Sequence, residues 1–384
     1  MNKIGNILSG GNAFTTALLV VAVVLAFLAP RAAVNVDEQL HYPQAKKVVN
    51  WYFTGGKDVS CLTTPHSNLK YYGQSVDNFT ALVNRVFHVK NEFILRHYTG
   101  AFFFLLLLFF SGLVARQLTG SYWSSVITVL AIVFMPRVFG QAFGNLKDIP
   151  FATGYVAGIY MIIRFIKELP RPRWSTAILL GLAIAFTCSV RIGGLILFAY
   201  LAFFSALYFA WKPFELKQIV STKPCFVRLM GQLTVVVITG YFAGLLFWPY
   251  ALQNVWVNPL ESLRVMEHYK VSIRQIFEGS LLWSTQLPRY YLFRWLLIST
   301  PEFIFFGFGV FLIFFIRKLS SKLIQFNPVF FESIVAFTFF FPVLYVVAIH
   351  SNLYSGIRQL IFILPLLAVL VSTAIFNLIK SDFK

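Results

Sequence analysis

Long apolar stretches recur along the chain and are separated by short polar connectors. A helix needs about 20 consecutive apolar residues to cross a bilayer, and most of these stretches reach that length. The fifth is shorter, because the segment "RIGG" at 191–194 interrupts the apolar run. The pattern predicts about ten membrane-spanning helices, at residues 12–30, 99–117, 122–140, 150–167, 176–190, 193–211, 230–250, 294–316, 330–349 and 358–379.

Two polar segments, about 31–98 and 251–293, are much longer than the other connectors. In the first, "HYPQAKKVVNWYF" predicts an amphipathic helix on the membrane surface, and a second helical pattern follows a turn at Gly73. In the second, Asn258 and Pro259 are typical of a helix start. We therefore predict an all-α integral membrane protein, in which residues 1–384 form a single polytopic domain with two long loops.

The basic residues predict which side of the membrane each connector faces. Lys and Arg concentrate in the connectors on one side, whereas the short connectors of the other side hold only Lys147, Arg191 and Arg358. Since cytoplasmic connectors carry the excess of Lys and Arg, both termini are expected in the cytoplasm and both long loops outside. A cleavable signal peptide is the alternative interpretation of the first apolar stretch.

The composition fits this interpretation. Hydrophobic residues make up 58% of the chain and charged residues 12%, whereas soluble domains carry about a quarter charged residues. The net charge of +18 lies mostly in short connectors, so it indicates membrane topology rather than nucleic-acid binding. Of the three cysteines, only Cys61 is expected outside the membrane on the outer side, which leaves no disulfide framework there.

Ionisable residues beside apolar spans are the strongest functional candidates. Asp37 and Glu38 follow the first span directly, where an unpaired carboxylate would lose hydration free energy. Lys147 and Asp148 occupy the short connector before the fourth span, which Pro150 opens. The structural alternatives are a solvated start of the loop for the first pair and a helix N-terminal acid for Asp148.

Two arginines are predicted at the same membrane face. Arg191 ends the fifth span beside two glycines, and Arg358 begins the last span close to Gly356. An arginine at that depth fits a phosphate or carboxylate partner, and the alternative is an interfacial anchor whose charge reaches the headgroups. His66, Asp77 and His268 are candidate ligands of a divalent metal, although no tight ligand spacing supports such a site.

These residues converge on one membrane face beneath two folded loops. A carboxylate there can accept a proton, and the arginines can hold an anion. The combination indicates an enzyme that acts on an anionic lipid at the outer membrane surface.

The same residues resemble the GT-C fold integral-membrane glycosyltransferases, and among them the protein O-mannosyltransferase and aminoarabinose transferase families. The resemblance rests on an acidic "DE" after the first span, a second acid after the third and a basic residue after the fifth. It also rests on three stretches that match the bacterial relatives in order and placement: "LKYYGQSVD" at 69–77, "PRYYLFRWLLISTP" at 288–301 and "SGIRQLIFILP" at 355–365.

The resemblance implies an inverting transfer of a sugar from a polyprenyl-phosphate donor to an acceptor hydroxyl, in a bacterial inner membrane. It implies no certain cofactor, and a divalent metal stays open. Asp37 matches the general base and Asp148 matches the supporting acid. Glu38 is expected to help orient the acceptor or the base. The expected residues around the donor phosphate are Arg191, Arg358 and Lys147, and the expected substrate contacts are Tyr71, Tyr72, Asp77 and His66.

Three other functions are compatible with parts of the pattern. A transporter or flippase of lipid-linked sugars would place polar groups near mid-membrane on related halves, and no internal symmetry is visible here. A ligase or polymerase of envelope polysaccharides usually has its longest outer loop late in the chain. A catalytically silent scaffold would tolerate the loss of Asp37. The sugar is not specified, and the acceptor is open between protein, lipid and polysaccharide.

Overall fold

The computed structural model describes residues 10–64, 67–267, 272–320 and 326–382, and these are almost entirely helical. The chain divides into two compact units. Unit 1 comprises Met1–Ala32, Gly100–Phe143 and Glu267–Lys384, and unit 2 comprises Ala33–Thr99 and Gly144–Met266. Helix α4 (Glu92–Thr119) begins in unit 2 and continues into unit 1.

Unit 2 holds the first long loop and a bundle of helices that follows it. Its elements are α2 (Val36–Phe53), the 3₁₀-helix η2 (Leu69–Tyr71), α3 (Ser75–Phe87), the start of α4, α7 (Asp148–Lys167), α8 (Trp174–Val190), η3 (Ile192–Leu195), α9 (Ile196–Trp211), α10 (Pro213–Ser221), α11 (Lys223–Ile238), the π-helical η4 (Thr239–Ala243), α12 (Pro249–Gln253) and α13 (Asn258–Glu267).

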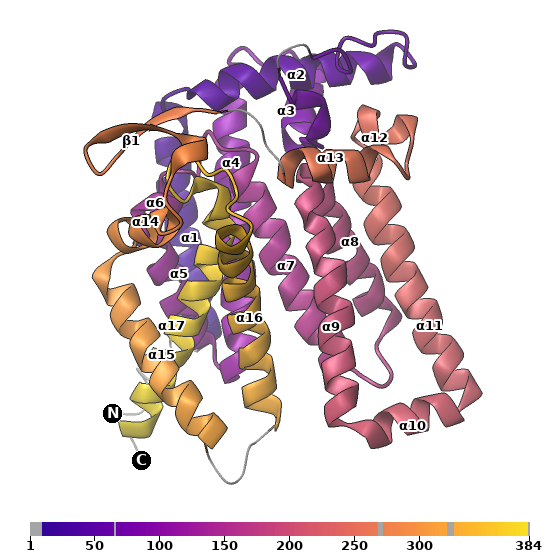
Figure 1. Cartoon of the computed structure of the whole chain (residues 1–384), viewed down its shortest axis with the longest axis vertical. Helices are drawn as coiled ribbons and strands as arrows, with labels where there is room; N and C mark the ends of the chain where they lie inside the picture. Colours follow the sequence, from indigo (N-terminus) through magenta and orange to yellow (C-terminus); the bar gives the residue numbers. More distant parts are fainter. Residues whose placement is uncertain (1–9, 65–66, 268–271, 321–325, 383–384) are drawn as a thin grey trace. The chain divides into compact units, whose positions relative to one another are not determined.

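Helix α7 forms the core of unit 2. It packs against α8 and α9, α8 packs against α11, and α10 joins α9 to α11 at one end of the bundle (Figure 1). About 89% of the apolar stretch of α7 is buried by other helices, which explains why its residues are apolar on all sides. Pro150 lies in its first turn, as predicted, where a missing N–H disturbs no helical hydrogen bond.

Unit 1 is built around the last helix of the chain. Its elements are α1 (Gly10–Leu28), η1 (Ala29–Arg31), most of α4, α5 (Tyr122–Val133), α6 (Pro136–Phe139), β1 (Arg274–Phe277), β2 (Ser280–Trp283), η5 (Ser284–Gln286), α14 (Tyr291–Ser299), α15 (Glu302–Ser320), α16 (Phe326–Ala348), η6 (Arg358–Ile363) and α17 (Leu364–Asp382). α17 packs against α5, α15 and α16, and α1 packs against α5 (Figure 1).

The predicted integral membrane class is confirmed, and the two helices predicted in the first loop are present as α2 and α3. Over the described residues, eight helices are long and apolar enough to cross a membrane, and two further apolar helices, Tyr122–Val133 and Trp174–Val190, are shorter. The predicted number of ten spans is therefore not confirmed. The predicted start of a helix at Asn258 and Pro259 is present in α13.

Three details of the prediction are wrong. The stretch 122–140 is not one helix, because α5 ends at Val133 and Pro136 opens the separate α6. The stretch 294–316 is interrupted before α15, where Pro301 disfavours helical backbone at the residue before it. The second loop also contains an antiparallel hairpin, β1–β2, whose two turn residues Glu278 and Gly279 both have positive φ.

Candidate active site

The acids after the first apolar helix begin helix α2, and Glu38 secures that beginning. The Asn35 side chain accepts a hydrogen bond from the Glu38 backbone N–H at 3.0 Å, and the Glu38 carboxylate accepts one from the Asn35 N–H at 3.1 Å. This reciprocal capping box satisfies two backbone donors that a helix start otherwise leaves open. Glu38 is fully buried, so its carboxylate holds α2 in place and does not face solvent.

Arg96, in the first turns of α4, neutralises two buried acids. Its Nη2 lies 2.6 Å from Asp77 Oδ1, and its Nε lies 3.5 Å from Glu38 Oε1. His97 Nε2 approaches Glu38 Oε1 at 3.3 Å. All four side chains are almost completely buried, and a buried charge is tolerated only when it is paired. The network therefore fixes α2, α3 and α4 to one another.

Two glycines let other backbone segments approach this network. A Cβ atom at Gly144 would lie 2.3 Å from the Asn35 side chain and 2.6 Å from the Glu38 carboxylate. A Cβ atom at Gly73 would lie 2.0 Å from the backbone oxygen of Ser189, at the end of α8. Only glycine fits at such distances. The connector before α7 therefore packs closely against the start of α2, and the "YYG" segment packs closely against the end of α8.

Asp37 is the acid of this region that remains accessible, with 28% of its side chain exposed. Its Oδ2 lies 3.3 Å from Lys147 Nζ, which also lies 3.1 Å from His41 Nε2. His41 Nδ1 is 2.6 Å from the side-chain oxygen of Gln74. Since the ammonium donates to Nε2, Nδ1 must carry the ring proton and donate to Gln74. One tautomer of His41 thus fixes Lys147 against Asp37.

The charge state of His41 follows from its surroundings. Burial, and then the positive charge of Lys147, lower the pKa of His41 to about 4. The imidazole is therefore neutral at pH 7 and can accept the hydrogen bond from Lys147.

Asp148 forms a second pair beside the first. Its carboxylate accepts a hydrogen bond from Asn145 Nδ2 at 2.7 Å and forms an ion pair with Arg191 Nη2. Asp148 is buried, whereas 20% of the Arg191 side chain is exposed. The buried Nε–H of Arg191 has no hydrogen-bond partner among the described residues. A buried N–H without a partner is rare in folded proteins, so this donor is available for an anion.

The structure accordingly brings together four of the predicted site residues. Asp37 contacts Lys147, Asp148 follows Lys147 in the chain, and Asp148 contacts Arg191. The arrangement combines one accessible carboxylate with two cationic side chains. A group of this kind can accept a proton and stabilise negative charge nearby.

The two tyrosines of the "YYG" segment lie in different surroundings. The Tyr72 ring meets the His41 ring edge-on at a centroid distance of 5.6 Å, and Lys147 Nζ lies 5.3 Å from the Tyr72 ring centroid. Tyr71 instead donates a hydrogen bond to Glu261 at 3.2 Å and packs edge-on against Tyr250. Tyr72 therefore borders the Asp37–Lys147 pair, whereas Tyr71 joins the first long loop to α13.

The remaining predicted residues lie elsewhere. Arg358 begins η6 and belongs to unit 1. His66 and His268 fall outside the described residues, and Asp77 is committed to its ion pair with Arg96. Among the residues that the structure describes, no group of three or more His, Cys, Asp and Glu side chains is arranged to hold a metal ion.

The sequence interpretation missed five residues of this region: His41, Gln74, Arg96, His97 and Asn145. Two signals were available for the histidine and the arginine. His41 follows Asp37 by four residues, a spacing that places both on one side of a helix. Arg96 and His97 immediately precede a long apolar run and are therefore also ionisable groups at its boundary.

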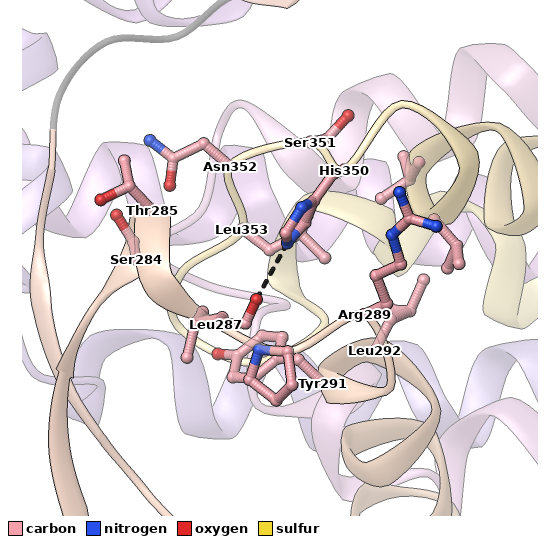
Figure 2. Close-up of a pocket in the computed structure, with 13 residues that line it drawn as sticks. Ser284, Thr285, Leu287, Arg289, Tyr291, Leu292, His350, Ser351, Asn352 and Leu353 are labelled. Atoms are coloured by element: carbon pink, nitrogen blue, oxygen red, sulfur yellow. Dashed lines mark hydrogen bonds between the residues drawn. The ribbon is translucent and has the colours of Figure 1, made fainter.

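Unit 1 contains a cavity of about 120 Å³ between the start of α14 and the connector after α16. Figure 2 shows the His350 ring within it, where Nε2 donates to the backbone oxygen of Leu287 at 2.9 Å. One side carries hydroxyl and amide groups, including those of Thr285 and Asn352, and Arg289 lies on the opposite side beside Leu292. Its lining contains no Asp or Glu, so it offers no counterpart to the carboxylate and cations of unit 2.

Comparisons with known proteins agree with the expected fold. Residues 69–253, just under half of the chain, match the family model described as dolichyl-phosphate-mannose-protein mannosyltransferase (PMT). This range includes Asp77, Lys147, Asp148 and Arg191 and begins after Asp37. A comparison with curated proteins finds no significant match.

Two solved structures have a similar fold. One is the crystal structure of ArnT from Cupriavidus metallidurans bound to undecaprenyl phosphate, with a TM-score of 0.57 and 15% identity over 94% of this chain and 59% of that chain. The other is the Archaeoglobus fulgidus oligosaccharyltransferase in complex with Zn and sulfate, with a TM-score of 0.54 and 13% identity over 97% of this chain and 49% of that chain. The chain thus spans 59% of the first protein and 49% of the second, and the predicted GT-C fold is confirmed.

Proposed function

We propose that the protein is a membrane glycosyltransferase that moves a sugar from a polyprenyl-phosphate donor to an acceptor hydroxyl, with inversion at the anomeric carbon. The observation that carries the proposal is the accessible Asp37 carboxylate held against Lys147, with the Asp148–Arg191 pair next to it. The PMT match over residues 69–253 and the fold shared with ArnT, whose crystal structure is bound to undecaprenyl phosphate, support the same reaction class.

In the proposed reaction the acceptor hydroxyl lies against Asp37. The acceptor oxygen forms a bond to the anomeric carbon while its proton passes to the Asp37 carboxylate, which acts as the general base. The bond between the anomeric carbon and the phosphate oxygen breaks, and the electron pair leaves with the polyprenyl phosphate. Attack from the face opposite the leaving group inverts the configuration, as in other single displacements at sugars.

The cationic residues would act on the leaving phosphate. Negative charge grows there as the glycosidic bond breaks, and donors fixed before the reaction stabilise it without reorganisation. Arg191 offers an unpartnered Nε–H, and Lys147 already lies beside the base. Asp148 would hold the guanidinium in place, and Glu38 would hold the start of α2 and thereby Asp37. Arg358 of unit 1 remains a predicted phosphate ligand.

The proposal includes the orientation of the protein. The distribution of Lys and Arg favours cytoplasmic termini and a reaction at the opposite membrane face, which for a bacterial host is the periplasmic face of the inner membrane.

Mass spectrometry of lipid-linked sugars tests this function directly. Cells would carry the wild-type protein, the Asp37→Asn variant or neither. We expect a polyprenyl-phosphate sugar to accumulate without the protein and with the variant, because removal of a general base slows transfer by about 10²–10⁴-fold. Identical lipid pools in all three strains, with the variant present in the membrane at wild-type level, would contradict the proposal.

A further inference from the structure

A polar groove of about 520 Å³ lies on the side of α2 that faces α3 and the start of α4. This volume falls within the usual range of ligand sites, about 300–1,000 Å³. On α2 it is lined by Lys46, Val49 and Asn50, which recur at helical spacing and lie at least two turns beyond Asp37, on the opposite side of the helix. Its lining consists of Lys46, Val49, Asn50, Ala81, Asn84, Arg85, His88, Val89 and Glu92.

We propose that this groove binds a saccharide that carries a carboxylate or phosphate group. Lys46 and Arg85 bring two positive charges, and Glu92 brings one negative charge, so the lining is net cationic. Asn50 and Asn84 add amides that can both donate and accept hydrogen bonds, as a sugar hydroxyl requires. The site is distinct from the residues assigned to the transfer reaction.

The polar side chains can exchange their present partners for a ligand. Lys46 pairs with Glu92 at 2.5 Å, but the two side chains are 49% and 34% exposed, and ion pairs in contact with solvent contribute little to stability. Arg85 donates to the Asn50 side chain and stacks on the Phe53 ring at 4.1 Å. The guanidinium is thus held in place, and it carries further N–H donors beyond the one that Asn50 accepts.

His88 provides independent support for a ligand. It ends α3 with a left-handed backbone, φ 49°, at a position where glycine is usual. Among the described residues its exposed ring has no hydrogen-bond partner. A residue held in a sparsely populated conformation, with its functional group directed into a groove, points to a binding role.

The walls favour a saccharide over a peptide. They come from α2, α3, the first residue of α4 and the α3–α4 connector, which holds His88 and Val89, so no strand edge is available for an extended chain. Val49, Ala81 and Val89 are the apolar residues of the lining. The C–H face of a sugar ring fits against such residues while its hydroxyls meet the amides.

The groove also contacts the network that holds α2. The Tyr42 ring lies beneath it, with Lys46 Nζ 4.6 Å from the ring centroid and the Arg96 guanidinium 4.7 Å from it. Asn84 donates to the Tyr42 hydroxyl at 2.7 Å. A ligand that binds Lys46 and Asn84 therefore lies one side chain away from Arg96.

Calorimetric titration of the full-length protein in lipid nanodiscs tests the proposal without any sugar donor, so its outcome does not depend on the transfer reaction. The probes are the trimer of α-1,4-linked galacturonic acid, maltotriose as the neutral trimer of like linkage, and inorganic phosphate. We expect the acidic trimer to bind at least tenfold more tightly than maltotriose and to resist displacement by phosphate. Equal affinity for both trimers, or displacement by phosphate, would overturn the proposal.

Two variants locate the site. Arg85→Gln is expected to weaken binding of the acidic trimer at least tenfold, whereas Arg289→Gln, an exposed arginine of unit 1, should leave it unchanged. His88→Gly should weaken binding without lowering the melting temperature, because glycine adopts the left-handed backbone without strain. Wild-type affinity in both Arg85→Gln and His88→Gly would overturn the assignment.

Discussion

The two units of the molecule bury their polar groups in different ways. Unit 2 buries paired charges, including Glu38, Asp77, Arg96 and Asp148. Unit 1 buries mainly hydroxyl groups such as those of Thr128 and Ser372, and Glu332 is its one buried charged side chain among the described residues. Hydroxyl groups can satisfy one another or a nearby backbone carbonyl, whereas a buried charge requires an opposite charge. The proposed reaction site thus lies in the unit that buries paired charges.

The buried charges of unit 2 also support one partly exposed carboxylate. Glu38, Asp77 and Arg96 fix the helices, while Asp37, paired with the buried Lys147, remains in reach of a ligand. A site of this kind keeps its reactive groups in place because the supporting residues are themselves fixed. Substitutions in each unit can test whether the comparison holds.

The largest effect is expected for Arg96→Met. It leaves two carboxylates, Glu38 and Asp77, buried without their partner, and the loss of one member of a buried pair lowers the free energy of unfolding by about 3–5 kcal/mol. Thermal unfolding of the purified protein would measure the change.

The matched variant in unit 1 is Lys318→Met, which removes the partner of the buried Glu332. The loss in free energy of unfolding should be smaller, because only one acid, Glu332, loses its partner and Lys318 is itself 30% exposed. Equal destabilisation by the two variants would remove the distinction between the units.

A second prediction concerns the donor. Arg191→Ala should weaken binding of undecaprenyl phosphate to the purified protein by about 10–100-fold, since a hydrogen bond to a charged group contributes about 1.5–3 kcal/mol. Arg191→Lys should retain part of the affinity, because it keeps the charge and loses the planar fork. If both variants bind as tightly as the wild type, Arg191 is an interfacial anchor, which is the alternative interpretation from the sequence.

The sequence indicated part of this site because of where its residues fall. Asp37, Lys147, Asp148 and Arg191 each lie at the end of an apolar stretch, and the predicted topology placed those ends at one membrane face. The order of spans is readable from hydropathy, because only long apolar helices cross a bilayer. The proximity of these residues within unit 2 therefore agrees with the prediction, while their roles stay predictions.

The sequence did not indicate which of the two acidic side chains, Asp37 or Glu38, would be buried and which would be exposed. Asp37 and Glu38 are adjacent, but adjacent residues on a helix point about 100° apart, so one is accessible and the other is buried. Which of the two turns inward depends on Arg96, more than fifty residues later in the chain, and on the close approach of Gly144. Such long-range pairing leaves no local pattern in a single sequence.

The β1–β2 hairpin was missed for a different reason, because its strands are short and its Glu278-Gly279 turn is a weak signal.

A third prediction is that protonation of His41, in unit 2, lowers the free energy of unfolding at acidic pH. The pKa of His41 is about 4 in the folded protein and 6.5 when exposed, so below pH 6.5 the unfolded state binds the additional proton. Stability from this residue is therefore complete above pH 6.5 and is lost as the pH falls toward 4, by about 2 kcal/mol at pH 5. Unfolding curves of the wild type and of His41→Gln between pH 7 and pH 5 would measure it. A wild-type curve that parallels that of the variant would contradict the assignment.

The smallest effect is expected for the neutral polar contacts of unit 1. Thr128 and Ser372 share a buried hydrogen bond of 2.6 Å between α5 and α17, and each hydroxyl is also within hydrogen-bond distance of a backbone carbonyl of its own helix. Thr128→Val should therefore lower the free energy of unfolding by only about 1 kcal/mol, because Ser372 keeps its contact with the Val369 carbonyl.

A double-mutant cycle with Ser372→Ala isolates the contact itself, which for hydroxyl pairs between membrane helices contributes about 0.6 kcal/mol. A coupling of several kcal/mol would mean that hydroxyl groups hold unit 1 together as firmly as ion pairs hold unit 2. The contrast between the units would then lie in the type of polar group and not in how strongly each unit depends on it.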